Sequence, residues 1–179
     1  AYAESPYFPL EVGRQWSYVS EGGYTSSREV VSQATILGRN VYVMRILETS
    51  SEEYYSISSD GDLLWHGSKR SGLEIYPDPP LVLLKANAVP GDSWITSYQV
   101  YCDPAGGEPS GPTGEYLIEV LALEDINVPA GQFAALKTMG GSVPGCSLDK
   151  FTLPAGVCPS GSVGLQAGDI DVQVHAWYH

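Results

Sequence analysis

The sequence predicts an all-β chain, a single antiparallel meander of about nine to eleven strands that forms a curled sheet, a half-barrel or a sandwich. Short segments rich in β-branched and aromatic residues alternate with turn residues at fairly regular spacing, which is typical of these architectures. Helical periodicity is almost absent. We therefore expect one β domain over residues 1–179, with an N-terminal arm over 1–12 and loops over 102–113 and 140–162. A loop is also expected over 77–80, because its prolines do not suit a sheet interior.

The first expected strand begins with Trp16 and Tyr18, whose side chains share one face. Further strands in this half are expected over residues 28–37, 40–48, 53–58 and 63–68. A turn at 38–40 separates the first two of these. Asp60-Gly61 favours a type I′ hairpin between the last two.

Alternation between two faces is clearest in the second half of the chain. One strand directs Trp94 and Tyr98 inward and ends at Cys102, which we expect to point inward as well. Another strand is expected over 132–139. Two other strands in this half have one apolar face each. The first face is formed by Tyr116, Ile118, Val120 and Ala122. The second, in the segment 169–179, is formed by Ile170, Val172, Val174, Ala176 and Tyr178.

The charge of the chain excludes one class of partner. The sequence has 21 acidic and 9 basic residues and a formal net charge of −12. Nucleic-acid binding needs clustered Lys and Arg, and Lys69-Arg70 is the one adjacent basic pair. The longest apolar run, 81–84, is too short to span a bilayer, so we expect no transmembrane segment.

The start of the chain and its cysteines indicate an exported protein. The chain opens at Ala1 without a Met, which fits a mature product whose leader has been removed, although an excised segment looks the same. Cys146 and Cys158 flank a short loop, and a disulfide between them would contribute on the order of 3 kcal/mol. Three reduced, buried thiols are the alternative. We expect a secreted or cell-surface location, with the periplasm as the alternative.

No catalytic, cofactor-binding or metal-binding constellation is recognisable. Gly91-Asp92-Ser93 lacks the strand-to-helix setting of a serine esterase, so we interpret it as a turn. His175 and His179 lie about 13 Å apart on one strand, too far to share a metal, although a site between copies is an alternative. The two Asp-x-Asp pairs, at 60–62 and 169–171, are interpreted as turn and strand-end chemistry. We expect no cofactor.

Two segments are candidates for an interface with another chain. The N-terminal arm carries the aromatic residues Tyr2, Tyr7 and Phe8, and either packs on its own domain or reaches a neighbour. The last expected strand presents a second candidate set on its polar face, namely His175, Trp177 and His179.

Five phrases follow one another along the chain: residues 7–18 (YFPLEVGRQWSY), 59–64 (SDGDLL), 89–94 (VPGDSW), 128–133 (VPAGQF) and 162–165 (SVGL). Together they resemble a broad group of bacterial exported proteins and lipoprotein domains of unknown function. The resemblance implies a curled antiparallel sheet, like the half-barrels of lipoprotein carriers, and transfers no catalytic residue. The chain departs from the group in the insertion 146–161 and lacks the lipobox cysteine, so it gives no support for a lipid anchor.

Three functions remain in view. The first is a non-enzymatic structural or interaction module outside the cytoplasm, such as a self-assembling subunit of an extracellular fibre or surface layer. The second is a binding module whose curled sheet holds an apolar ligand or a hydrophobic segment of a partner. The third is a hydrolase, which needs a Ser/His/Asp or paired-acid geometry that the pattern disfavours.

Overall fold

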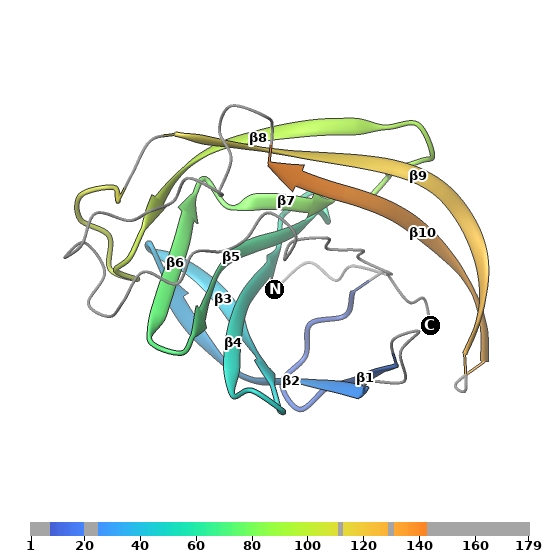
Figure 1. The fold of residues 1–179 in the computed structure, drawn as a ribbon, viewed down its shortest axis with the longest axis horizontal. Coiled ribbons are helices and arrows are strands. Elements are labelled where there is room, and N and C mark those ends of the chain that lie inside the picture. Colours follow the sequence, from blue (N-terminus) through green and yellow to red (C-terminus); the bar gives the residue numbers. More distant parts are fainter. Residues whose placement is uncertain (1–7, 20–24, 111–112, 129–130, 143–179) are drawn as a thin grey trace.

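The computed structural model describes residues 8–19, 25–110, 113–128 and 131–142. These residues form ten strands and no helix (Figure 1). The strands are β1 (Gln15–Val19), β2 (Thr25–Ile36), β3 (Arg39–Ile46), β4 (Ser51–Ile57), β5 (Leu63–Arg70), β6 (Leu73–Asp78), β7 (Leu81–Leu84), β8 (Ser93–Tyr101), β9 (Gly114–Val128) and β10 (Gly131–Ser142).

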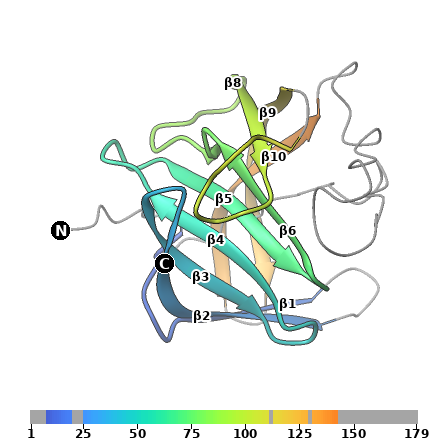
Figure 2. The ribbon, with the colours of Figure 1, turned by 90° about the vertical axis from the view of Figure 1, so that its left-hand side faces the viewer.

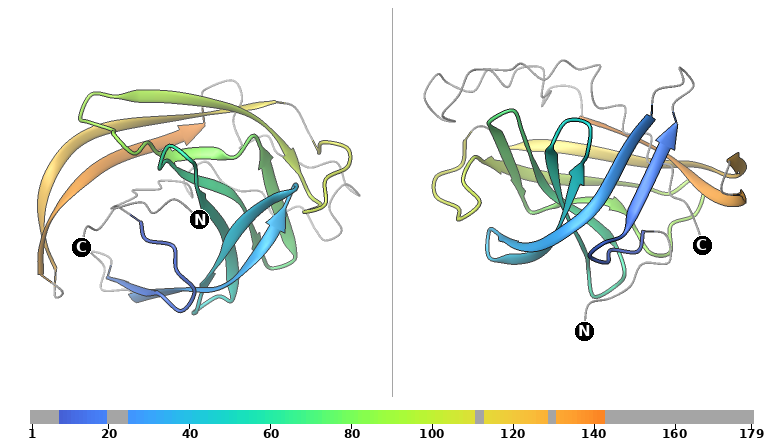
Figure 3. Two further views of the ribbon diagram at one scale, coloured as in Figure 1. Left: turned by 180° about the vertical axis from the view of Figure 1, so that it is seen from behind. Right: turned by 90° about the horizontal axis from the view of Figure 1, so that it is seen from below.

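All ten strands belong to one antiparallel sheet. The order of neighbours is β1-β2-β3-β4-β5-β6-β8-β9-β10, and β7 pairs with β5 beside this path. The sheet curls strongly, as the views from the side, from behind and from below show, but no ladder joins β1 to β10 in the described part of the chain (Figures 2 and 3). The expected curled antiparallel meander is therefore confirmed.

The main core lies on the concave face of the sheet. The inward faces expected for β8 and β9 are confirmed at Trp94, Tyr98 and Val100 of β8 and at Tyr116, Ile118 and Val120 of β9. Ala122, expected on the same face of β9, follows the irregularity at Leu121 and is not part of this core. The buried members of the main core come from β2 to β5, β7 to β10 and the β7–β8 connection: Val30, Met44, Tyr55, Leu63, Leu81, Leu83, Leu84, Ala88, Trp94, Tyr98, Val100, Tyr116, Ile118, Val120 and Leu136.

A second, smaller core lies on the opposite face of β3. Val41 and Val43 point into it together with Tyr54 and Tyr76, whereas Met44 points into the main core. The segment after β8 lies over this second core, and the Leu37 N–H donates a hydrogen bond of 2.7 Å to the Pro104 carbonyl. The central strand β3 is therefore buried on both faces.

The tight turns differ from those expected. Leu37 and Gly38 have φ of 47° and 75°, and Ser71 and Gly72 have 50° and 84°, the signs that a two-residue type I′ hairpin requires. The expected type I′ turn at Asp60-Gly61 is wrong, since only Gly61 has positive φ there. Ser58 and Asp62 instead close a longer loop through the Ser58 N–H, which bonds the Asp62 carbonyl at 2.9 Å.

The expected loop over 77–80 is wrong for its first two residues. Pro77 and Asp78 end β6, and Pro77 pairs with Val100 on β8. Residues 73–75 of β6 pair with β5, whereas residues 76–78 pair with β8. Pro77 thus has a neighbour on one side only, so its missing N–H leaves no gap between two ladders.

Candidate functional site

The two ends of the sheet differ in length. β1 is a five-residue strand that pairs with β2, and β10 is a twelve-residue strand that pairs with β9 from end to end. Among the residues that the structure places, neither strand has a neighbour on its other side (Figure 1). β10 also runs through residues 140–142, which were expected to belong to a loop. A long edge strand of this kind presents a row of backbone N–H and C=O groups to a partner.

The sequence of β10 carries few of the features that block strand pairing. It contains no proline, and Lys137 is its one charged residue. The Lys137 ammonium is 3.2 Å from the Glu124 carboxylate on β9, so its charge is already neutralised in part. The irregularity between β9 and β10 skips Leu121 of β9 and leaves β10 continuous. The edge therefore keeps the regular backbone that an added strand needs.

Thr138 is a buried polar residue in the middle of this edge strand. Its side chain is 3% exposed, and its Oγ1 has no hydrogen-bond partner within the described part of the chain. Buried hydroxyl groups in native proteins nearly always have a partner. Thr138 is therefore an exception to this rule within the edge strand.

An exposed apolar patch lies on the convex face of β8, β9 and β10, next to the edge. Ile95, Leu121 and Met139 are 55%, 47% and 49% exposed. Ile95 lies directly opposite Leu117 on β9, and Met139 lies opposite Glu119. Exposed apolar side chains beside an unpaired strand edge are candidates for contact with a partner. We call Ile95, Leu121 and Met139 the convex patch.

Of the predicted interface residues in the N-terminal arm, the structure describes Phe8, and this residue packs on its own domain. The ring of Phe8 stacks on Trp16, with centroids 5.3 Å apart and planes 6° from parallel, and its centroid is 5.6 Å from that of Tyr55. Both Phe8 and Leu10 pack against the main core. The self-packed alternative therefore describes Phe8.

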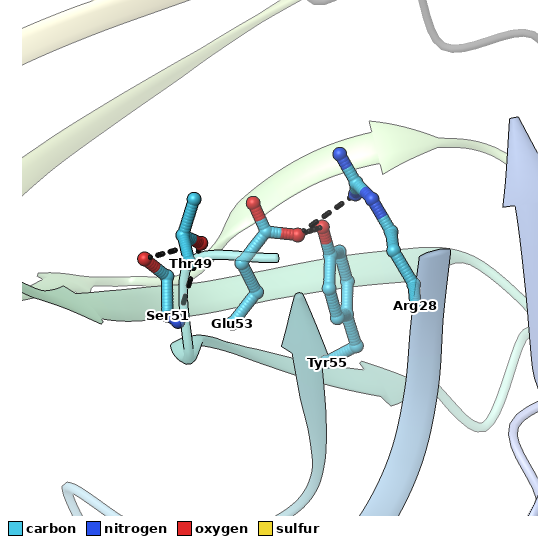
Figure 4. Close-up of polar contacts among 5 residues, drawn as sticks. All are labelled: Arg28, Thr49, Ser51, Glu53 and Tyr55. Atoms are coloured by element: carbon cyan, nitrogen blue, oxygen red, sulfur yellow. Dashed lines mark hydrogen bonds and ion pairs between the residues drawn. The ribbon is translucent and has the colours of Figure 1, made fainter. Parts of the chain in front are cut away.

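A charged cluster lies on the concave side between β2 and β4 (Figure 4). Arg28 Nη1 lies 2.9 Å from the Glu53 Oε2, and the Tyr55 hydroxyl donates a 2.7 Å hydrogen bond to the same oxygen. Thr49 and Ser51, in the adjoining turn, are joined by a hydroxyl hydrogen bond of 3.0 Å. The Glu53 carboxylate is thus held in place by a guanidinium group and a phenol, as part of a structural network.

Ser56 and His66 form a Ser–His hydrogen bond, the pair from which nucleophilic catalysis could start. The Ser56 Oγ lies 2.7 Å from His66 Nε2, and His66 is 2% exposed. Burial lowers the pKa of His66 to about 4, and the positive charge of Arg39 adds to this effect. Within the described ranges no carboxylate hydrogen-bonds to this imidazole, so the pair lacks the orienting acid of a triad. We therefore assign it a structural role, as a neutral, satisfied pair.

Acidic residues that were interpreted as turn chemistry have that role where the structure describes them. Asp62 accepts a hydrogen bond from the Ala86 N–H at 3.0 Å, and Asp92 accepts one from the Val89 N–H at 3.0 Å. No group of three or more His, Cys, Asp or Glu residues that could hold a metal ion occurs in the described ranges.

The cysteines lie mostly beyond the described ranges. Cys102, just past β8, is half-buried and disulfide-bonded, and its partner lies outside the described residues. Cys146 and Cys158, the expected pair, lie there as well. Because the chain has three cysteines, a bond from Cys102 within the chain and a bond between Cys146 and Cys158 exclude each other.

The remaining predicted interface residues are also outside the part of the chain that the structure describes: Tyr2, Tyr7, His175, Trp177 and His179. Neither the β10 edge nor the convex patch was predicted from the sequence. The absence of proline and the near absence of charge over 131–142 were visible in the sequence, but they point to an edge only once the strand order is known.

Comparisons with known proteins found no family model, no curated protein and no solved structure that matches this chain. The described part of the chain contains no helix with the length and apolar character needed to cross a membrane.

Proposed function

We propose that this chain is a non-enzymatic structural or interaction module that acts outside the cytoplasm and joins polypeptide chains by strand addition at β10. The observation that carries the proposal is the twelve-residue edge of β10, which has no neighbour beyond β9 in the described sheet. In strand addition, main-chain hydrogen bonds supply affinity and alternate side chains supply specificity.

The surroundings of the edge support the same function. The convex patch lies beside it, and one of the three patch residues, Met139, is on β10 itself. A subunit that accepts one strand and donates another can repeat without limit, which is the geometry of a fibre or surface layer. The exported location is proposed on the cysteines of the chain.

The apolar-ligand alternative has less support. The concave face, where such a ligand would bind, is occupied by the side chains of the main core, which are 0% to 8% exposed. The aromatic side chains of the core therefore fill the concave side of the sheet.

The test places like charges along the edge. We expect the double variant Ala134→Glu/Met139→Glu to abolish concentration-dependent association, because both side chains are exposed on β10 and added charge protects edge strands. Gln33→Glu/Thr35→Glu is the matched control, since it adds the same charge at exposed positions of β2, a strand with neighbours on both sides. Sedimentation velocity and electron microscopy report the association.

If the β10 variant and the β2 control associate alike, strand addition at β10 is wrong. If neither they nor the unmodified chain associates with itself, the test moves to extended peptides in solution, and failure of every tested peptide to bind would count against the edge as a binding site.

A further inference from the structure

We infer that the strand added at β10 is residues 169–179 of a second copy of this chain. The inference rests on the proposed function and names the donor segment and its source. It also gives a role to the candidate interface residues His175, Trp177 and His179.

The segment 169–179 suits the β10 edge in length and in pattern. The segment 169–179 has the cleanest period-two pattern in the sequence, lies outside the described residues and nearly equals β10 in length. An acceptor edge of twelve residues can therefore pair with the whole segment.

The two faces of the segment also suit the two faces of β10. On β10, Leu136 and Thr138 are buried on the concave side, whereas Met139 is exposed on the other side. A donor strand with one apolar and one polar face fits this edge with its apolar face on the concave side, because a slip of one residue would bury the polar face. In this orientation Asp169 and Asp171 lie on the convex side, together with Lys137 of β10.

A second copy of the chain is favoured over the same chain as the source of the added strand. Pairing with a segment from the same chain covers the backbone edge but brings no further surface to the convex patch. A neighbouring copy brings both its donor segment and a body that can cover Ile95, Leu121 and Met139. Because each copy carries one donor and one acceptor, the contact is head-to-tail and continues as a filament. With a net charge of −12 per chain, added salt should strengthen the contact.

The experiment mixes two blocked forms of the full chain. Val174→Pro blocks the donor, because proline removes an N–H from the centre of the segment. Ala134→Glu/Met139→Glu blocks the acceptor and keeps the donor. Ser162→Pro, outside the donor segment, is the matched proline control. Sedimentation velocity is measured for each form alone and for an equimolar mixture, after circular dichroism has established that each form is folded.

We expect both blocked forms to be monomers and their mixture to form a one-to-one dimer, while Ser162→Pro associates like the unmodified chain. A synthetic peptide of residues 169–179 should inhibit association of the unmodified chain, and this arm requires no substitution. Each blocked form alone should associate about tenfold or more weakly than the unmodified chain.

Three results would overturn the inference. If Val174→Pro associates normally while the β10 variant does not, another donor fills the edge, and the proposed function stands without the inference. The same conclusion follows if both variants are monomers and the mixture forms no dimer. If the unmodified chain is a monomer at every concentration and salt level, residues 169–179 do not join copies of the chain, and self-assembly is wrong as well.

Discussion

Arg45 on β3 lies directly opposite Glu52 on β4, and its Nη2 is 3.1 Å from the Glu52 Oε1. This pair is the centre of a row that crosses five strands on the convex face. Every direct neighbour in the row has the opposite charge, in the order Glu29, Arg45, Glu52, Lys69 and Glu74. Direct opposition of unlike charges favours this register over a slipped one.

Reversal of the central charge tests this row. We expect Glu52→Lys to lower the free energy of unfolding by about 1 kcal/mol, because it places like charges between Arg45 and Lys69. Glu29→Lys is the control at the end of the row, where Arg45 is the one cationic neighbour, and it should cost less. Urea unfolding measures both values. Equal losses for the two variants would show that the row does not act as a unit.

The sequence predicted the alternation within strands well, because that pattern is local. Trp94 and Tyr98 point inward on β8, as their spacing requires. It did not predict contacts between distant residues, such as Arg28 with Glu53, since these depend on strand order. Leu37 at positive φ was also missed: leucine rarely adopts this conformation, and a hydrogen bond to Pro104 supports it here.

The edge shows the same limit for the candidate site. The composition of 131–142 was visible in the sequence, but the position of β10 at the end of the described sheet was not. The loop expected from residue 140 ended this strand too early, and two consecutive glycines, Gly140 and Gly141, are more typical of turns than of strands. Gly140 instead lies beneath the side chains of Tyr116 and Ile118, where a small residue fits between strands.

Gly67, the one glycine of β5, is predicted to tolerate substitution poorly. Its φ is +132°, and a Cβ at this position would lie 2.0 Å from the Ile75 carbonyl oxygen. We expect Gly67→Ala to lower the free energy of unfolding by about 2 kcal/mol or more. Gly38→Ala is the control, because Gly38 has positive φ but open space around it, and should cost about 1 kcal/mol. A Gly67 variant no less stable than the control would contradict the close approach to Ile75.

His66 predicts a pH dependence of stability. Burial lowers its pKa to about 4 in the folded chain, so the unfolded chain binds the proton more readily. The contribution of the neutral imidazole is therefore complete above about pH 6.5 and decreases as the pH falls toward 4, by about 3 kcal/mol in total.

The variant His66→Gln isolates this contribution, because the acidic residues that titrate in the same range are common to both proteins. We expect its free energy of unfolding to decrease less than that of the unmodified chain between pH 7 and pH 4. Parallel curves for the two proteins would mean that His66 is accessible to protons in the folded state.

The disulfide of Cys102 is open to a direct test. We expect a peptide map without reduction to contain a disulfide-linked peptide that includes Cys102. Alkylation before digestion should leave one of the three cysteines labelled if the bond forms within one chain. Linkage of Cys146 to Cys158, with Cys102 alkylated, would contradict this expectation and support the pairing predicted from the sequence.

The most direct test of strand addition is hydrogen–deuterium exchange of β10 across a range of protein concentrations. We expect amides in 132–141 to become protected as the chain associates, because an added strand bonds the N–H groups that face away from β9. Peptides from β2, which already has two neighbours, should exchange at a constant rate. Exchange in β10 that does not change while the chain associates would contradict the account, because the copies would then meet through another surface.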